Sequence, residues 1–250
     1  MKTKRSKKTS KMNFGIIAAG EGSRLVNEGV EKSKPLLNIC GEPMIGRLIR
    51  IYERAGAKNI CVVINSFMPD VKEYLESLKK DLSVPLILKV QTTPSSMHTF
   101  YELSQILPDR SRFIATTVDT IFKEEAFQKY VDAFRESGKD IDGMMAVTDF
   151  IEDEKPLYVE VDGKDDITGF LDVGNDGLKY VSGGIYGLGD KAIDVLEKAI
   201  GDNVSRMRNY QRLLIKSGLH LKAFPMGKIV DVDHVSDIAR AEDFLEEKEQ

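Results

Sequence analysis

The first 138 residues alternate between short apolar runs and longer stretches with helical periodicity. The apolar runs occupy residues 14–19, 59–65, 86–91 and 112–119. Each is followed by a stretch with apolar residues at helical spacing, at 43–56, 70–80, 97–107 and 124–138. Apolar runs without a period are typical of strands that are buried on both faces. Four strand–helix units in succession predict parallel strands joined by right-handed crossovers, with helices on both faces of the sheet.

After about Gly138 the pattern changes to strands separated by turns. These strands are expected at 144–148, 157–162, 167–172 and 178–189, and they predict an antiparallel extension of the sheet. Two helices, two strands and a closing helix follow, at 190–200, 205–218, 219–226, 228–233 and 235–250. We therefore expect a Rossmann-like α/β three-layer sandwich with a mostly parallel, mixed central sheet. In such sheets, ligands bind beyond the carboxyl ends of the parallel strands.

Composition excludes several classes of protein. Hydrophobic residues make up 42% and charged residues 30%, as in globular domains, and no apolar run approaches the length of a membrane-spanning helix. The two cysteines, Cys40 and Cys61, form no CxxC pair, so a reducing cytoplasm is expected. Residues 1–11 carry six Lys and Arg and no acid, and we predict a disordered basic tail there. Because the rest of the chain is acidic, neither nucleic acid nor a membrane is expected as a partner.

A glycine-containing loop follows the first strand. Gly20 and Gly22 allow backbone N–H groups to approach an anion, and Ser23 and Arg24 come next. The loop does not match a dinucleotide-binding fingerprint, because Leu25 stands where the third glycine is required. It also lacks the GK[ST] of a Walker P-loop.

Lys34 precedes Pro35 about ten residues further on, and a Gly-x-Pro-Met-Ile segment follows at 41–45. Together with the loop, these segments resemble the sugar-1-phosphate nucleotidyltransferases, or NDP-sugar pyrophosphorylases. The resemblance implies that Arg24 and Lys34 are catalytic and hold the phosphates of a nucleoside triphosphate. It further implies a nucleotide-binding set made of Ala18, Ala19, Gly20, Gly22, Ser23, Thr93 and Ser96. Where the family usually has a glycine this chain has Ser96, so the nucleobase stays open, and helix capping is an equal explanation for these hydroxyl groups.

Three aspartates are candidate ligands of Mg²⁺. Asp119 ends a buried strand, where the family carries a metal-binding aspartate, although Val118 replaces the usual preceding glycine. Asp231 and Asp233 alternate on the last predicted strand and should share one face. The resemblance implies Asp233 as the second ligand with Asp231 in support, and the choice between them stays open. Mg²⁺ typically takes one or two carboxylates together with substrate phosphates.

The acceptor side is implied by the same resemblance. Glu160 would bind sugar hydroxyls, and the turn containing Ser182 and Gly183 would lie under the sugar. His234 stands beside the last aspartates, but a lone histidine of this kind is more often structural. The resemblance ends with the closing helix, so no hexapeptide-repeat acyltransferase domain is expected to follow.

We therefore expect one nucleotidyltransferase domain over 12–250, with a nucleotide-binding half (12–140) and an acceptor-binding half (141–250). Its expected partners are a nucleoside triphosphate and a sugar 1-phosphate or similar phosphomonoester. A cytidylyltransferase acting on phosphocholine or another phosphomonoester is the alternative within the class. A non-catalytic nucleotide sensor and an NAD(P)-dependent dehydrogenase are the alternatives outside it. The sequence leaves the base, the acceptor and the oligomeric state open.

Overall fold

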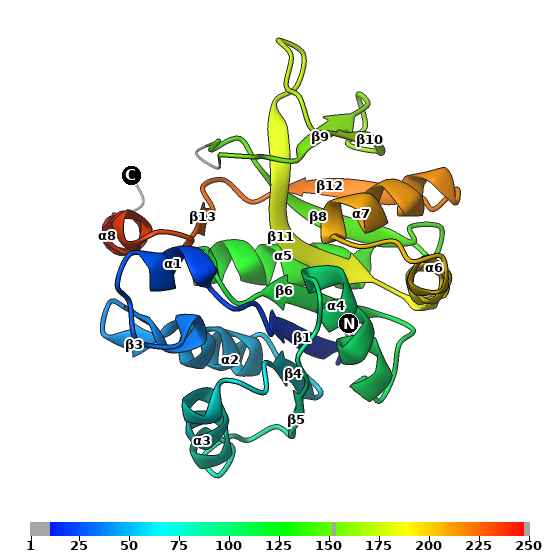
Figure 1. Cartoon of the computed structure of the whole chain (residues 1–250). Helices are drawn as coiled ribbons and strands as arrows, with labels where there is room; N and C mark the ends of the chain where they lie inside the picture. Colours follow the sequence, from blue (N-terminus) through cyan, green and yellow to red (C-terminus); the bar gives the residue numbers. More distant parts are fainter. Residues whose placement is uncertain (1–10, 152–153, 248–250) are drawn as a thin grey trace, which may run out of the picture.

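The computed structural model describes residues 11–151 and 154–247 and places a mixed sheet between two layers of helices (Figure 1). The predicted Rossmann-like three-layer arrangement is confirmed. Four parallel strands lie side by side in the order β6-β1-β4-β5. Their bounds are Phe113–Thr117 for β6, Asn13–Ala18 for β1, Ile60–Ile64 for β4 and Leu86–Val90 for β5. The β-α alternation therefore predicted this part of the sheet correctly.

The second part of the sheet is mainly antiparallel. Strand β11 (Tyr180–Leu188) runs antiparallel to β6, to β8 (Gly143–Thr148) and to β9 (Tyr158–Val161). Strand β10 (Ile167–Leu171) pairs antiparallel with β9 at the edge. Strand β12 (Leu221–Pro225) instead pairs parallel with β8. The long connection between these two strands contains two helices, and such a connection allows a parallel return.

The helices cover both faces of the sheet. One face carries α2 (Met44–Arg54), α3 (Pro69–Leu78) and α5 (Glu124–Glu136), and the other carries α4 (Ser96–Ile106), α6 (Asp190–Gly201) and α7 (Met207–Lys216). Side chains of β1 alternate between them, because successive residues of a strand point to opposite faces. Phe14 packs edge-on against Tyr52 of α2, with ring centroids 4.9 Å apart. Ile17 joins the core on the side of α4.

The C-terminal segment forms a separate small sheet beside the main one. Strand β13 (Val230–Asp231) pairs antiparallel with β7 (Thr120–Ile121), directly after β6. Helix α8 (Val235–Glu246) then packs against the first part of the chain, where the remaining short elements lie: α1 (Ser23–Asn27), the 3-10 helix η1 (Lys34–Leu36), β2 (Asn38–Ile39) and β3 (Glu42–Pro43). The predicted strand 228–233 is thus shorter than expected, and Asp233 lies beyond its end.

Three sequence predictions are only partly covered by the structure. Residues 1–10 of the predicted basic tail lie outside the described residues. The main sheet contains strands from both predicted halves, but the division near residue 140 stays a prediction. Over residues 11–151 and 154–247, no helix is long and apolar enough to cross a membrane.

Candidate active site

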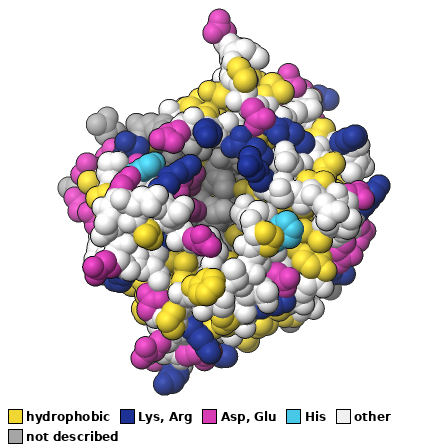
Figure 2. All heavy atoms as spheres, viewed as in Figure 1, with side chains coloured by type: hydrophobic (Ala, Val, Ile, Leu, Met, Phe, Trp, Pro, Cys, Tyr) yellow, Lys and Arg dark blue, Asp and Glu magenta, His cyan; other side chains and the backbone are white. Residues whose placement is uncertain are grey.

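A cleft opens at the carboxyl ends of β1 and β6, where β13 approaches them. It consists of two adjoining cavities of about 530 Å³ and 350 Å³, which share Ser96, Thr117, Asp119 and Asp233 in their walls. Figure 2 shows the hollow near the middle of one face, with Lys and Arg side chains gathered along its rim. The location is that expected for ligand sites in open α/β sheets.

The glycine-containing loop forms one wall of the larger cavity, as predicted. Ala19, Gly20, Gly22 and Ser23 all line it. Gly22 has φ = 65°, in the left-handed region, and a Cβ atom there would lie 3.0 Å from Cβ of Lys34. Glycine therefore permits both the turn and the close approach to Lys34. Ala18 does not line either cavity, because it is the last residue of β1 and its side chain points into the core on the α2 side.

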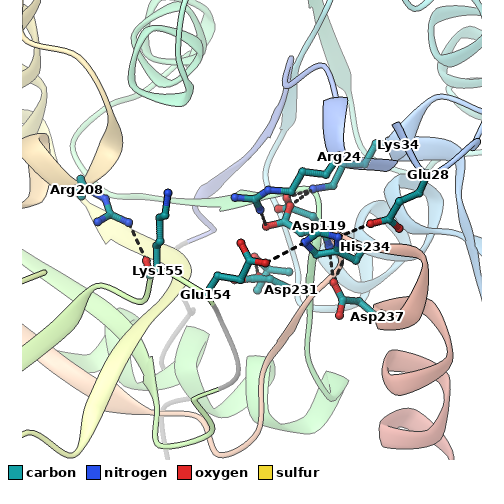
Figure 3. A network of polar contacts seen from close by, with 12 residues as sticks. Arg24, Glu28, Lys34, Asp119, Glu154, Lys155, Arg208, Asp231, His234 and Asp237 are labelled. Atoms are coloured by element: carbon teal, nitrogen blue, oxygen red, sulfur yellow. Dashed lines mark hydrogen bonds and ion pairs between the residues drawn. The ribbon is translucent and has the colours of Figure 1, made fainter. Parts of the chain in front are cut away.

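Four charged side chains from distant parts of the sequence meet between the two cavities (Figure 3). Lys34 Nζ lies 2.5 Å from Oδ2 of Asp119 and 2.8 Å from Oδ1 of Asp233. Arg24 Nη1 lies 2.6 Å from the other carboxylate oxygen of Asp233. The backbone holds this arrangement together, since the N–H of Val232 donates to the carbonyl oxygen of Asp119 at 3.1 Å. Predicted phosphate-binding and predicted metal-binding residues thus form one network.

Lys34 and Asp233 hold each other in the charged form. Burial alone would lower the pKa of Lys34, but the negative charges of Asp119 and Asp233 raise it above its ordinary value. Burial would likewise raise the pKa of Asp233, yet the positive charges of Lys34 and Arg24 hold it below its ordinary value. Two basic and two acidic side chains therefore lie in contact at the centre of the cleft.

Asp231 lies beside this network without joining its ion pairs. Its carboxylate accepts a hydrogen bond from Thr120 Oγ1 at 3.0 Å, across the β7–β13 pair. The side chain is open to the cleft, but protein surrounds it closely on its other sides. This burial and the charge of Asp119 raise the pKa of Asp231 to about 7. Asp231 is therefore held by Thr120 and influenced by the charge of Asp119 rather than paired with a cation.

The residues of the cleft fit a divalent cation of the hard-oxygen type. Asp119 and Asp233 present carboxylate oxygens to the same lysine ammonium group, so they converge on one place. Within the described part of the chain, no group of three or more His, Cys, Asp or Glu side chains is arranged to hold a metal by itself. Two converging carboxylates are a donor set that Mg²⁺ can use, since it takes one or two carboxylates and completes its shell with water and substrate phosphates.

The smaller cavity has a basic rim that the sequence analysis did not find. Lys155, Arg206 and Arg208 line it, on the side away from the glycine-containing loop. Arg208 donates to Oδ1 of Asp172 at 2.6 Å and to the carbonyl oxygen of Lys155 at 2.8 Å, so the rim is partly ordered by its own contacts. No short motif marks these residues. The available signal was the pair of arginines at the start of the predicted helix 205–218.

The structure brings most of the remaining predicted residues to the cleft. Thr93 and Ser96 line the larger cavity, and Ser182 lines the smaller one, where its hydroxyl donates to Gln211 Oε1 at 3.0 Å. Gly183 follows Ser182 and lines a further small pocket, whose wall also contains Arg24, Asp231 and Asp233. Glu160 is not part of the cleft. It is exposed on β9, and its carboxylate accepts a hydrogen bond from Thr168 of β10 at 3.1 Å.

The hydroxyl groups near the start of α4 are not engaged in capping. Ser95 is the N-cap residue, but its side chain makes no capping hydrogen bond and instead contacts Nδ1 of His98 at 2.8 Å. Thr93 Oγ1 pairs with Thr99 Oγ1 at 2.6 Å. The capping explanation given for Thr93 and Ser96 therefore has no support in the geometry, and Thr93 is instead held against Thr99 in the wall of the larger cavity.

His234 has a structural role, as the sequence analysis favoured. Its Nδ1 lies 2.5 Å from Oε1 of Glu28, and this contact raises the pKa of His234 and lowers that of Glu28. His234 is also the N-cap of α8, in a reciprocal capping box with Asp237. The residue therefore fastens the C-terminal helix to the end of α1.

Comparison with known proteins places this geometry in a family. Residues 15–168 match the MobA-like NTP transferase domain. The chain belongs to this family. The resemblance to nucleotidyltransferases seen in the sequence is thereby confirmed.

Individual relatives of this NTP transferase chain share parts of its sequence. Mannose-1-phosphate guanyltransferase 2 of Candida glabrata is 30% identical over 118 residues, which cover 44% of this chain and 32% of that protein. A 2-aminoethylphosphonate cytidylyltransferase of Lancefieldella rimae is 29% identical over 122 residues, or 47% of each chain. The chain thus spans a third to a half of these curated relatives.

The fold is shared over nearly the whole chain. The inositol-1-phosphate CTP transferase of T. maritima superposes with a TM-score of 0.77 at 15% sequence identity, covering 97% of this chain and 99% of that one. At this identity the likeness shows the architecture alone. The acceptors named for these three proteins are all small phosphorylated or phosphonate compounds.

Proposed function

We propose that this NTP transferase joins a nucleoside triphosphate to a sugar 1-phosphate, giving a nucleotide-sugar and pyrophosphate. The observation that carries the proposal is the meeting of Arg24, Lys34, Asp119 and Asp233 between two cavities, one lined by the glycine-containing loop and the other by cations. The first cavity would take the nucleotide and the second the acceptor. In-line transfer needs the two substrates to meet at such a junction.

On the nucleotide side, the phosphates would lie against Ala19, Gly20, Gly22 and Ser23, with Arg24 and Lys34 neutralising their charge. An oxygen of the acceptor phosphate attacks the α-phosphorus, and the bond from that phosphorus to the bridging oxygen breaks. Pyrophosphate leaves with the electron pair, so no covalent enzyme intermediate and no oxidant are required. Positive groups around the leaving pyrophosphate stabilise the charge that develops on it.

Asp119 and Asp233 would hold Mg²⁺, with Asp231 supporting them. When bound, the ion supplies charge neutralisation at the phosphates that are being separated. The chain's own contribution at this point is to fix the two carboxylates through the backbone hydrogen bond from Val232 to Asp119 and through the β7–β13 pairing. Thr93 and Ser96 would contact the nucleobase or ribose.

On the acceptor side, Lys155, Arg206 and Arg208 would attract the phosphate of the incoming substrate. Ser182, Gly183 and Gln211 would form the floor under the rest of it. A rim with three cations favours an acceptor without positive charge, and therefore a sugar phosphate over phosphocholine. Glu160 has no part in this proposal, because it lies outside the cleft.

The test is pyrophosphate release from the purified full chain with Mg²⁺. ATP, CTP, GTP, UTP and dTTP are each combined with a panel of sugar 1-phosphates, inositol 1-phosphate, 2-aminoethylphosphonate and phosphocholine. Release with a triphosphate and a sugar 1-phosphate supports the proposal and identifies both substrates. Release only with phosphocholine or the phosphonate assigns the alternative acceptor class. Triphosphate binding without release from any combination favours the nucleotide sensor.

Two features of the setting belong to the proposal as well. Cys40 and Cys61 are both free thiols, in keeping with a reducing cytoplasm as the place of action. The proposed partners are small molecules only, with no nucleic acid and no membrane. Sedimentation of the purified chain would give its oligomeric state.

A further inference from the structure

Most carboxylate oxygens of the proposed metal ligands are already engaged in ion pairs within the chain. Asp119 and Asp233 together have four carboxylate oxygens. Three of them contact cations of the chain itself, two through Lys34 and one through Arg24. Within the described residues, Oδ1 of Asp119 is the one that makes no hydrogen bond or ion pair. The proposed metal ligands are therefore already bound to internal cations.

Lys34 is held in this position by its surroundings. Its side chain is only 10% exposed, whereas that of Arg24 is 46% exposed. Lys34 begins η1 with Pro35 directly behind it, and its Cβ packs against Gly22 of the glycine-containing loop. The ammonium group therefore stays between the two carboxylates when no ligand is bound, although it faces the larger cavity.

The charges at this point are balanced without a metal. Lys34 and Arg24 carry two positive charges, and Asp119 and Asp233 carry two negative charges. A divalent cation added alone must compete with Lys34 for the same oxygens and leaves an excess of positive charge. A nucleoside triphosphate changes this balance, because its phosphate oxygens offer Lys34 and Arg24 new partners and release the carboxylates.

We propose that Lys34 holds the metal position in the free protein and keeps divalent cations out until a nucleotide arrives. The proposal rests on the metal site of the proposed function and assigns Lys34 a second task besides phosphate binding. Metal and nucleotide then enter together, and the free protein does not collect metal ions from solution. Lys34 is in this sense a positioning residue that sets the order of binding.

The experiment measures Mn²⁺ binding to the full chain without nucleotide, by electron paramagnetic resonance of the free ion. Lys34→Met removes the ammonium group but keeps an unbranched side chain of similar length. We expect this variant to bind Mn²⁺ at least about tenfold more tightly than the wild type, which is a common size for coupling between two ligand positions. Mn²⁺ should also raise the melting temperature of Lys34→Met more than that of the wild type.

Three further variants isolate the cause. Lys34→Arg keeps a cation in place and should bind Mn²⁺ as weakly as the wild type. Lys32→Met removes an exposed lysine two residues away and should change nothing. Adding Asp119→Asn to Lys34→Met should abolish the gain, which would locate the ion at Asp119.

The comparison of the wild type with Lys34→Met can overturn the inference. Binding of one Mn²⁺ per chain without nucleotide, equally tight in the wild type and in Lys34→Met, would contradict it. If Lys34→Met does not fold, as judged by circular dichroism, Lys34→Gln is measured in its place. Turnover by the wild type together with unchanged Mn²⁺ affinity in these variants defeats the inference and leaves the proposed function intact. If the wild type shows no turnover but Lys34→Met binds Mn²⁺ more tightly, the inference is supported and the proposed function is contradicted.

Discussion

Asp119 connects the two ends of the chain at the level of single atoms. Its carboxylate contacts Lys34 near the N-terminus, and its carbonyl oxygen accepts the N–H of Val232 near the C-terminus. The residue is also at the carboxyl end of the central strand β6. Its side chain and its backbone thus bind different segments, which makes substitution of the side chain alone informative.

Asp119→Asn should lower turnover by at least about 100-fold, the scale of losing one electrostatic contact in a transition state. The amide keeps the shape of the side chain but loses the charge that faces Lys34 and the proposed metal. Pyrophosphate release at saturating substrates measures the effect. Asp132→Asn is the matched control, since that side chain is 52% exposed on α5, and it should leave turnover unchanged. Wild-type turnover in Asp119→Asn would remove the residue from the site.

Arg206→Gln should raise KM for the acceptor by about tenfold and leave KM for the triphosphate unchanged, because a charge-assisted hydrogen bond contributes about 1.5–3 kcal/mol. The guanidinium group lines the smaller cavity and makes no hydrogen bond or ion pair with another described residue. Removing the guanidinium group should therefore change the stability of the fold little. Arg110→Gln, on an exposed pair with Glu197, serves as the control. An equal rise of both KM values would contradict the assignment of the two cavities.

Local sequence predicted the residues that lie within short motifs. Gly20, Gly22, Arg24 and Lys34 are fixed by their spacing in one segment, and Asp119 by its place at the end of an apolar strand. The basic rim could not be predicted in this way, because Lys155 and Arg208 come from different elements and meet only through the folding of the second half. Ala18 was predicted as a site residue because it lies next to the glycine-containing loop. Its side chain points into the core instead, since side chains alternate between the two faces of β1.

At the scale of elements, β11 carries a glycine whose conformation matters to the site. Gly184 has φ = 71°, and a Cβ atom there would lie 2.5 Å from Thr120 Oγ1 and 2.8 Å from Thr117 Oγ1. Thr120 is the residue whose hydroxyl donates to Asp231. The glycine thus lets β11 pass close to the turn that positions the aspartates.

Gly184→Ala should destabilise the fold by about 1–3 kcal/mol, through strain in the left-handed region and through crowding of the threonines. Turnover should fall as well, because Thr120 cannot keep its place beside Asp231. Urea unfolding and pyrophosphate release measure the two effects. Gly201→Ala is the control, since that glycine ends α6 and faces open space. A variant at Gly184 as stable as the control would disprove the crowding argument.

The order of elements was largely predictable, whereas their exact partners were not. Apolar periodicity gives the four strand–helix units, and handedness rules then give the parallel sheet. Strand β12 follows α6 and α7 in the chain and pairs in parallel with the much earlier strand β8. No local sequence pattern encodes that choice of partner. The last predicted strand was too long, because apolar and acidic residues alternate as far as Asp233. Only two of its residues, Val230 and Asp231, pair with β7.

At the scale of the whole molecule, the sheet divides the core into two large clusters, one on each face. Cys61 lies on β4 within one of them and is fully buried, with its thiol directed at the carbonyl oxygen of Ile106. Burial raises the pKa of Cys61 to about 12. Cys40 lies at the surface, in the turn between β2 and β3.

A thiol reagent such as dithionitrobenzoate should therefore modify one cysteine per folded chain at pH 8 and both in urea. Cys40 would be the reactive one, although burial and the charge of Glu242 raise its pKa and slow the reaction. Peptide mapping of the labelled chain identifies the site. Rapid modification of both thiols without denaturant would show that the core opens on the timescale of the reaction.

The site depends on a contact between Arg24 and Asp233, which are 209 positions apart. During synthesis on the ribosome, the glycine-containing loop therefore emerges long before Asp233. A nascent chain can fold its first parallel strands before Asp233 has been synthesised, and the site is then still incomplete. A nascent chain that stops before Asp231 has the glycine-containing loop but lacks the second carboxylate that Lys34 and Arg24 contact, and we expect it to be inactive.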